Sequence, residues 1–88
     1  MGRLGWNVPR YFLHIRNSTN RVQDLEGEDL NGLALAVEAA IDSARDVLVA
    51  RLRAHQRADG VGSQIEISDE AGNVLARVEF TDIVSGKL

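Results

Sequence analysis

The chain has 88 residues, no cysteine and a formal net charge of -3. This length suits one domain, and the lack of thiols excludes disulfides, cysteine nucleophiles and cysteine–zinc sites. The net negative charge disfavours non-specific binding to nucleic acid. Because no apolar stretch approaches the roughly 20 residues of a membrane span, and the first residues lack an apolar signal core, we expect a cytoplasmic protein.

The N-terminal residues are predicted to be a flexible segment, since two glycines and a proline weaken any regular element there. The predicted organisation is therefore a flexible segment at 1–8, one domain at 9–84 and a short tail at 85–88. Trp6 either folds back onto the domain or contacts a partner.

The first strand is predicted at 10–16, where apolar and polar side chains alternate. One face receives Tyr11, Leu13 and Ile15, and the other receives Phe12, His14 and Arg16. A polar turn at 17–20 leads to a short second strand at 21–25. An acidic connection containing Gly27 follows.

A long helix is predicted over 33–58, with its start near Asn31 or Gly32, Asn31 as the candidate N-cap, and Gly60 ending it. Large apolar residues recur at helical spacing, and three alanines fill the gaps on the same side. These residues are Leu33, Val37, Ile41, Leu48 and Leu52, with Ala36, Ala40 and Ala44. The helix should bury this stripe against a sheet.

The clearest β signal is a C-terminal hairpin formed by 63–68 and 74–80, with Gly72 in its loop. In the first strand the predicted inward residues are Ile65 and Ile67, and the outward residues are Gln64 and Glu66. In the second strand the predicted inward residues are Val74, Ala76, Val78 and Phe80, and the outward residues are Leu75, Arg77 and Glu79.

The element order β-β-α-β-β predicts a two-layer α+β domain, with a four-stranded, mainly antiparallel sheet and one long helix on one face. The right-handed crossover rule places 10–16 beside 74–80 if those two strands are parallel. The alternative places 63–68 in the centre of the sheet.

Three segments together resemble a family of small uncharacterised bacterial domains. They are the opening Pro9–Arg16, the connection Asp24-x-Glu26-Gly27-x-x-Leu30, and the hairpin Ile67–Leu75. The resemblance spans roughly 9–84 and implies a fold and a bacterial origin, without a reaction. A second resemblance, to the antitoxins of HicB-type toxin–antitoxin pairs, rests on the acidic, glycine-containing turn at 24–27.

No group of residues has the pattern of a catalytic, cofactor or metal site. Four carboxylates at 24–29 do not have the spacing of a calcium loop, and they are better explained as a solvated turn near a helix N-terminus. His14 has no serine or cysteine nucleophile at a recognisable motif beside it. We therefore expect a protein that is not an enzyme and needs no cofactor.

Basic residues gather at the end of the predicted helix. Arg51, Arg53, His55 and Arg57 could bind phosphate, with Arg10 and Arg16 as further candidates. A run of arginines near a helix C-terminus also compensates the carbonyl end of the helix dipole. The interleaving aromatic residues that stack single-stranded bases are absent from this stretch.

The face of the sheet away from the helix supplies the main functional hypothesis. We expect it, or a free strand edge beside it, to be an interface for a second copy of the chain or for another protein, with Phe12 and Leu75 exposed on adjoining strands. The candidate interface residues are Phe12, His14, Leu75, Arg77 and Glu79. The alternative is a nucleic-acid-associated regulator of the antitoxin type that uses the basic helix end.

Overall fold

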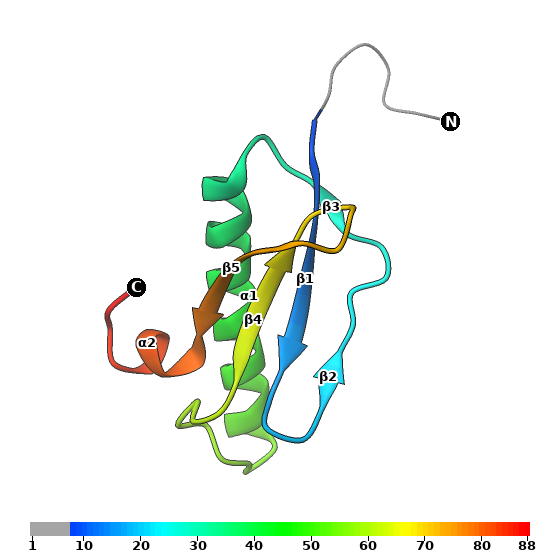
Figure 1. The fold of residues 1–88 in the computed structure, drawn as a ribbon. Helices are drawn as coiled ribbons and strands as arrows, with labels where there is room; N and C mark the ends of the chain where they lie inside the picture. Colours follow the sequence, from blue (N-terminus) through cyan, green and yellow to red (C-terminus); the bar gives the residue numbers. More distant parts are fainter. Residues whose placement is uncertain (1–7) are drawn as a thin grey trace.

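The computed structural model describes residues 8–88 as an α+β domain, with an antiparallel sheet on one long helix (Figure 1). The predicted two-layer α+β class is confirmed, but the sheet has five strands instead of four, because the short strand at 28–29 also pairs with the first strand. The predicted flexible segment, except for Val8, and Trp6 lie outside the described residues. The elements are β1 (Arg10–Arg16), β2 (Arg21–Val22), β3 (Glu28–Asp29), α1 (Leu33–Arg53), β4 (Gln64–Ser68), β5 (Val74–Glu79) and α2 (Phe80–Val84).

The sheet has the order β2-β1-β4-β5, and β3 pairs with the start of β1. Every pairing is antiparallel. The arrangement with the first strand beside the last is therefore wrong, and the alternative with the segment 63–68 in the centre is confirmed. The crossover rule does not apply, because it concerns parallel strands, and β1 and β4 run in opposite directions.

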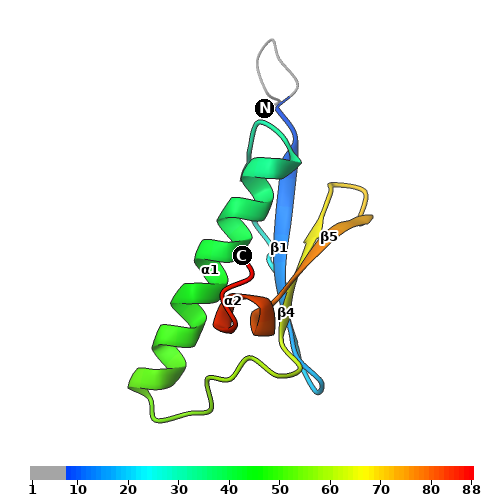
Figure 2. The ribbon, with the colours of Figure 1, turned by 90° about the vertical axis from the view of Figure 1, so that its left-hand side faces the viewer.

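The core lies between α1 and the face of β1, β4 and β5 that the helix covers (Figure 2). Leu13 is opposite Ile67, and Ile15 is opposite Ile65, so these four side chains lie on the same face. Both isoleucines of β4 are fully buried. The alternation predicted for these two strands is confirmed.

The helix buries a narrower stripe than its sequence suggests. Ala36, Ala40 and Ala44 are fully buried, whereas Leu33 and Leu52 are 38% and 63% exposed. The prediction that these two leucines belong to the core is wrong. The three alanines form the centre of the contact, because small side chains let a helix approach its neighbour closely. Larger residues such as Ile41 pack along the flanks of the contact.

The helix begins at the predicted residue, Leu33, but the predicted cap at Asn31 and the predicted C-terminal end are both wrong. The N-cap is Gly32, and it makes no side-chain capping bond, so Asn31 does not cap the helix. The helix ends at Arg53, with His55 in the left-handed conformation at φ 56°. The amide of His55 donates to the carbonyl of Leu52, and that of Gln56 donates to the carbonyl of Arg51. This pair of bonds is a Schellman motif, which closes the helix before Gly60.

Glycine at position 55 is expected to stabilise the protein. The left-handed conformation costs a residue with a Cβ atom about 1 kcal/mol, and the exposed His55 side chain makes no hydrogen bond or ion pair with the described residues that the change would remove. His55→Gly should raise the free energy of unfolding by about 0.5–1 kcal/mol in urea denaturation. His55→Ala keeps the Cβ atom and should give no such gain. Equal effects of the two changes would contradict this explanation.

The C-terminal hairpin departs from the predicted strand at both ends. A register shift after Ile67 pairs Ser68 with Val74 and leaves Leu75 as the extra residue of β5. Val74 is therefore on the uncovered face, and its predicted inward position is wrong. Phe80 is the first residue of α2 rather than the end of a strand, but its predicted burial is confirmed.

Gly60 contacts this aromatic residue. A Cβ atom at Gly60 would lie 2.8 Å from the backbone carbon and the Cβ atom of Phe80, and its φ of +79° disfavours other residues as well. The glycine that was predicted to end the helix instead allows the loop to pack against the start of α2.

Candidate functional site

The uncovered face of the sheet carries a row of polar and charged side chains. His14, Glu66 and Arg77 are directly opposite one another on β1, β4 and β5. Phe12, Ser68 and Val74 form the next row. We refer to the side of the sheet away from α1, seen at the right of Figure 2, as the outer face.

The predicted apolar patch on this face is not formed. Phe12 lies on β1 and Leu75 on β5, and β4 separates these two strands. Phe12 is half-buried, and its ring stacks on that of His14 with a centroid distance of 6.3 Å. Of the other candidate interface residues, Arg77 lies in the His14 row, and Glu79 is opposite Gln64.

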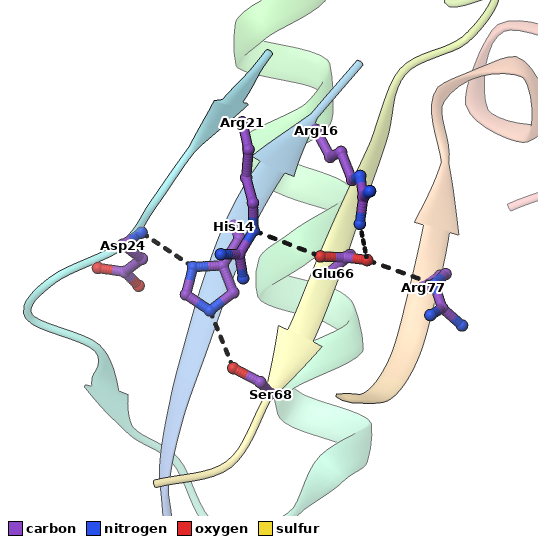
Figure 3. Close-up of polar contacts among 7 residues, drawn as sticks. All are labelled: His14, Arg16, Arg21, Asp24, Glu66, Ser68 and Arg77. Atoms are coloured by element: carbon purple, nitrogen blue, oxygen red, sulfur yellow. Dashed lines mark hydrogen bonds and ion pairs between the residues drawn. The ribbon is translucent and has the colours of Figure 1, made fainter. Parts of the chain in front are cut away.

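A buried carboxylate organises the charges of the outer face. Glu66 is 3% exposed, and Figure 3 shows its two oxygens between three arginines. The Arg16 Nη1 atom lies 3.2 Å from Oε2, and the Nε atoms of Arg21 and Arg77 each lie 3.6 Å from a carboxylate oxygen. All three arginine side chains are about half exposed. One carboxylate thus orients three guanidinium groups on an open surface.

His14 is buried beside this cluster, and both of its ring nitrogens have partners. The backbone N–H of Asp24 donates to Nδ1 at 3.0 Å, and Nε2 lies 2.9 Å from the Ser68 Oγ atom (Figure 3). Because Nδ1 accepts a hydrogen bond, the proton of the neutral ring is on Nε2. The ring therefore donates to Ser68.

This geometry opposes a serine nucleophile. In a Ser–His pair the imidazole Nε2 must accept the hydroxyl proton, and a third group must hold a proton on Nδ1. In His14 the direction of both bonds is reversed. Ser68 is also buried. The pair is therefore better suited to holding β1, β4 and the Asp24 turn together.

The Asp24 turn explains why the second strand is so short. The Asp24 carboxylate accepts the N–H of Leu13 at 3.1 Å, together with those of Glu26 and Gly27. The side chain thus takes the place of strand pairing beyond Val22, and the predicted strand at 21–25 is reduced to two residues.

Gly27 is needed in this turn. A Cβ atom at Gly27, where φ is +71°, would lie 2.8 Å from the ring of Phe12. The glycine therefore lets the acidic connection pass close to β1, next to the two-residue strand β3.

Acid should weaken the fold through His14 first. Burial lowers the pKa of His14 below 6.5, and the charge of Arg21 lowers it further, against the opposing effects of Asp24 and Glu66. The unfolded chain then binds a proton that the folded protein does not, so stability falls as pH drops below about 6.5.

Burial alone would raise the pKa of Asp24, but the amides of Leu13, Gly27 and Glu26 lower it. A second loss of stability therefore begins below the ordinary aspartate pKa of 3.8.

The histidine ring can be followed directly by NMR. We expect the His14 ring of the folded protein to titrate below pH 6.5, with the neutral form protonated at Nε2. A proton on Nδ1 would contradict the hydrogen-bond directions at His14, and a pKa above 6.5 would contradict the dominance of burial and Arg21 over the two nearby carboxylates.

The basic residues at the helix end do not form one cluster. Arg51 lies over the ring of Phe80 at 5.3 Å and donates to Ser63, and the Nε of Arg57 lies 2.7 Å from Asp59. Arg53 and His55 are exposed. Of the two further candidates, Arg10 is paired with Asp29 away from the helix C-terminus, and Arg16 belongs to the Glu66 cluster.

The acidic connection has structural roles in addition to its charge. Asp24 binds backbone amides, and Asp29 pairs with Arg10. Within residues 8–88, no three histidine or acidic side chains converge as metal ligands. In the same part of the chain, neither helix is long and apolar enough to cross a membrane.

Sequence reasoning missed the residues that organise the outer face. Glu66 was assigned to this face by strand alternation, but its burial depends on side chains from β1, β2 and β5 that come together only in the folded sheet. Arg21, Asp24 and Ser68 were not proposed as parts of a site. In the sequence, the glycine-containing turn that begins at Asp24 is the one feature that points toward these residues.

Comparison with known protein families gives one result. A family model described as a domain of unknown function, DUF6894, matches residues 10–81. No curated protein and no solved structure matches the chain. The match thus confirms the predicted resemblance to a domain family of unknown function. The individual motifs and the similarity to HicB-type antitoxins stay predictions. Because the match covers most of the chain, this protein belongs to the DUF6894 family.

Proposed function

We propose that this domain is a non-enzymatic protein-interaction module, bacterial and cytoplasmic, that pairs with a second copy of itself through the free edge of β5. The observation that carries the proposal is the difference between the two edges of the sheet. An exposed strand edge presents unpaired N–H and C=O groups that another strand can bind.

The edge at β1 is covered within the chain. β2 and β3 pair with the two ends of β1, and the Asp24 carboxylate accepts the Leu13 amide between them. This edge offers little backbone to a partner.

The edge at β5 is different. Within residues 8–88 no strand pairs with the side of β5 that faces away from β4. Val74 and Leu75 are 41% and 42% exposed at its start. The short helix α2 follows directly after the C-terminal end of β5 (Figure 1). The accessible part of the edge is therefore the N-terminal part of β5, which begins at Val74.

A second copy suits this edge. Two identical strands can pair antiparallel about a two-fold axis, and such an interface is self-complementary. Arg77 and Glu79 have opposite charges, so the edge does not carry a row of like charges that would repel its copy. Contact between two outer faces is less favourable, because each face has three arginines around one carboxylate.

The absence of a catalytic role is part of this proposal. The hydrogen-bond directions at His14 favour a structural histidine. A nucleic-acid-associated function of the antitoxin type is less well supported, because Arg51 and Arg57 are already engaged within the chain.

Lysine at Leu75 should abolish self-association. We expect light scattering at micromolar concentration to give the mass of a dimer for the wild-type protein and of a monomer for Leu75→Lys, because a buried lysine on an apolar edge is unfavourable. Leu25→Lys is the matched control, since Leu25 is 82% exposed near the covered edge, and it should remain dimeric. A well-folded wild-type protein that is strictly monomeric would rule the dimer out.

A further inference from the structure

The outer face contains a hollow of about 630 Å³ beside the turn that joins β1 and β2. Its lining combines three arginines with neutral hydrogen-bonding residues of the turn. The arginines are Arg16, Arg21 and Arg77, and the turn residues include Asn17, Ser18 and Asn20. Glu66 also lines the hollow.

The arginines retain hydrogen-bonding capacity. Arg21 and Arg77 contact Glu66 through Nε, and Arg16 does so through Nη1. The other guanidinium N–H groups of these three residues have no partner within residues 8–88. Each arginine carries five donors, so most of the donors in the cluster remain available to a ligand.

The turn adds donors to the rim of the hollow. The side-chain oxygen of Asn17 accepts hydrogen bonds from the amides of Thr19 and Asn20, at 3.0 and 2.7 Å, and from the Thr19 hydroxyl. These bonds use the acceptor end of the carboxamide. Its NH2 group has no partner among the described residues.

We propose that this hollow binds the dianionic phosphoryl group of a phosphomonoester. Three arginines around one carboxylate leave a surplus of two positive charges, which matches the charge of about -1.5 to -2 on a phosphomonoester at neutral pH. Guanidinium forks bind phosphate oxygens through paired hydrogen bonds. A carboxylate ligand would neutralise only half of the surplus.

Glu66 has a positioning role in this site. Its buried carboxylate pairs with the three guanidinium groups and holds them in one arrangement before a ligand arrives. This preorganisation reduces the conformational entropy that the arginine side chains lose on binding. The proposal goes beyond pairing through β5 and does not depend on it, because a ligand would contact side chains on the outer face, whereas strand pairing uses the backbone at the β5 edge. Val74 and Arg77 of β5 line the hollow from that outer face.

The test is an NMR titration of the full chain with sodium phosphate at constant ionic strength, balanced with sodium chloride. We expect saturable shifts of the amides at 17–21 and of the three arginine side chains. Arg21→Gln should weaken phosphate binding about tenfold, as expected for loss of a charged hydrogen-bond donor. Two arginines still pair with Glu66 in this variant, so the fold should persist, and the dispersion of the same spectra verifies it.

Arg45→Gln is the matched control, because Arg45 is a half-exposed arginine on α1 outside the cluster. Its affinity should stay within about twofold of wild type. Equal losses in the two variants, or shifts that chloride reproduces, would overturn the proposal.

Further probes identify the source of the phosphoryl group. Phosphoserine that binds as well as inorganic phosphate would indicate a site for the free anion, and tighter binding of phosphoserine would indicate a phosphorylated side chain. Acetate that binds as tightly as phosphate would overturn the preference for a dianion. Tighter, salt-sensitive binding of a single-stranded oligonucleotide that Arg53→Gln weakens would overturn the proposal in favour of nucleic acid.

Discussion

Replacing Glu66 with glutamine should destabilise the protein by about 3 kcal/mol, because it removes the buried carboxylate that compensates three arginines. Glu66 is buried, and the variant would keep Arg16, Arg21 and Arg77 close together with no opposite charge between them. The loss should fall at the lower end of the range for broken buried ion pairs, since half-exposed arginines can turn toward water. Urea denaturation measures the effect.

Glu79→Gln is the matched control. Glu79 lies on the same face and the neighbouring strand but is exposed, so this change should alter stability by less than about 0.5 kcal/mol. High salt should also narrow the difference between Glu66→Gln and wild type, because it screens the repulsion between the arginines. If the two variants were equally stable, Glu66 would not be the centre of the cluster.

Phe80→Ala should have an even larger effect, about 3–5 kcal/mol, which is typical for removing a fully buried phenylalanine. Phe80 is among the largest side chains with no exposed surface, and it joins α2 to the core. The change also removes the ring below the Arg51 guanidinium and the packing surface beside Gly60. In a small domain this loss is a large share of the total stability.

Phe12→Ala provides the comparison for Phe80→Ala. Phe12 is half-buried on the outer face, where its ring stacks on His14, so its removal should cost clearly less. Equal losses in thermal or urea denaturation would mean that the core does not lie between α1 and the inner face of the sheet.

Much of the fold could be predicted from alternation and periodicity. The faces of β1 and β4, the hairpin and the long helix each follow a local pattern that side-chain burial imposes on the sequence. The alanine stripe follows the same periodicity, but the pattern alone gives the large residues beside it equal weight. Whether the alanines or the large residues lie at the centre of the contact depends on the distance between the helix and the sheet. A periodic pattern in the sequence does not contain that distance.

The remaining features depend on contacts between distant segments. The bulge at Leu75 follows from the pairing of β5 with β4, and it reverses the side of Val74. The left-handed His55 was not recognisable, because Gly60 carried the usual signal for a helix end. Glu66 and Ser68 alternate with the inward isoleucines as any outward residues would. Glu66 is covered by arginines from three other strands, and Ser68 is bonded to His14 of β1.

The central claim is that two copies pair through β5, and amide hydrogen exchange at several protein concentrations tests it most directly. We predict that the β5 amides directed away from β4 become more protected as the concentration rises through the micromolar range, while amides in β1 do not change. Leu75→Lys should remove the concentration dependence, and Leu25→Lys should preserve it. Exchange in β5 that is independent of concentration, or protection that appears at another surface, would contradict this account.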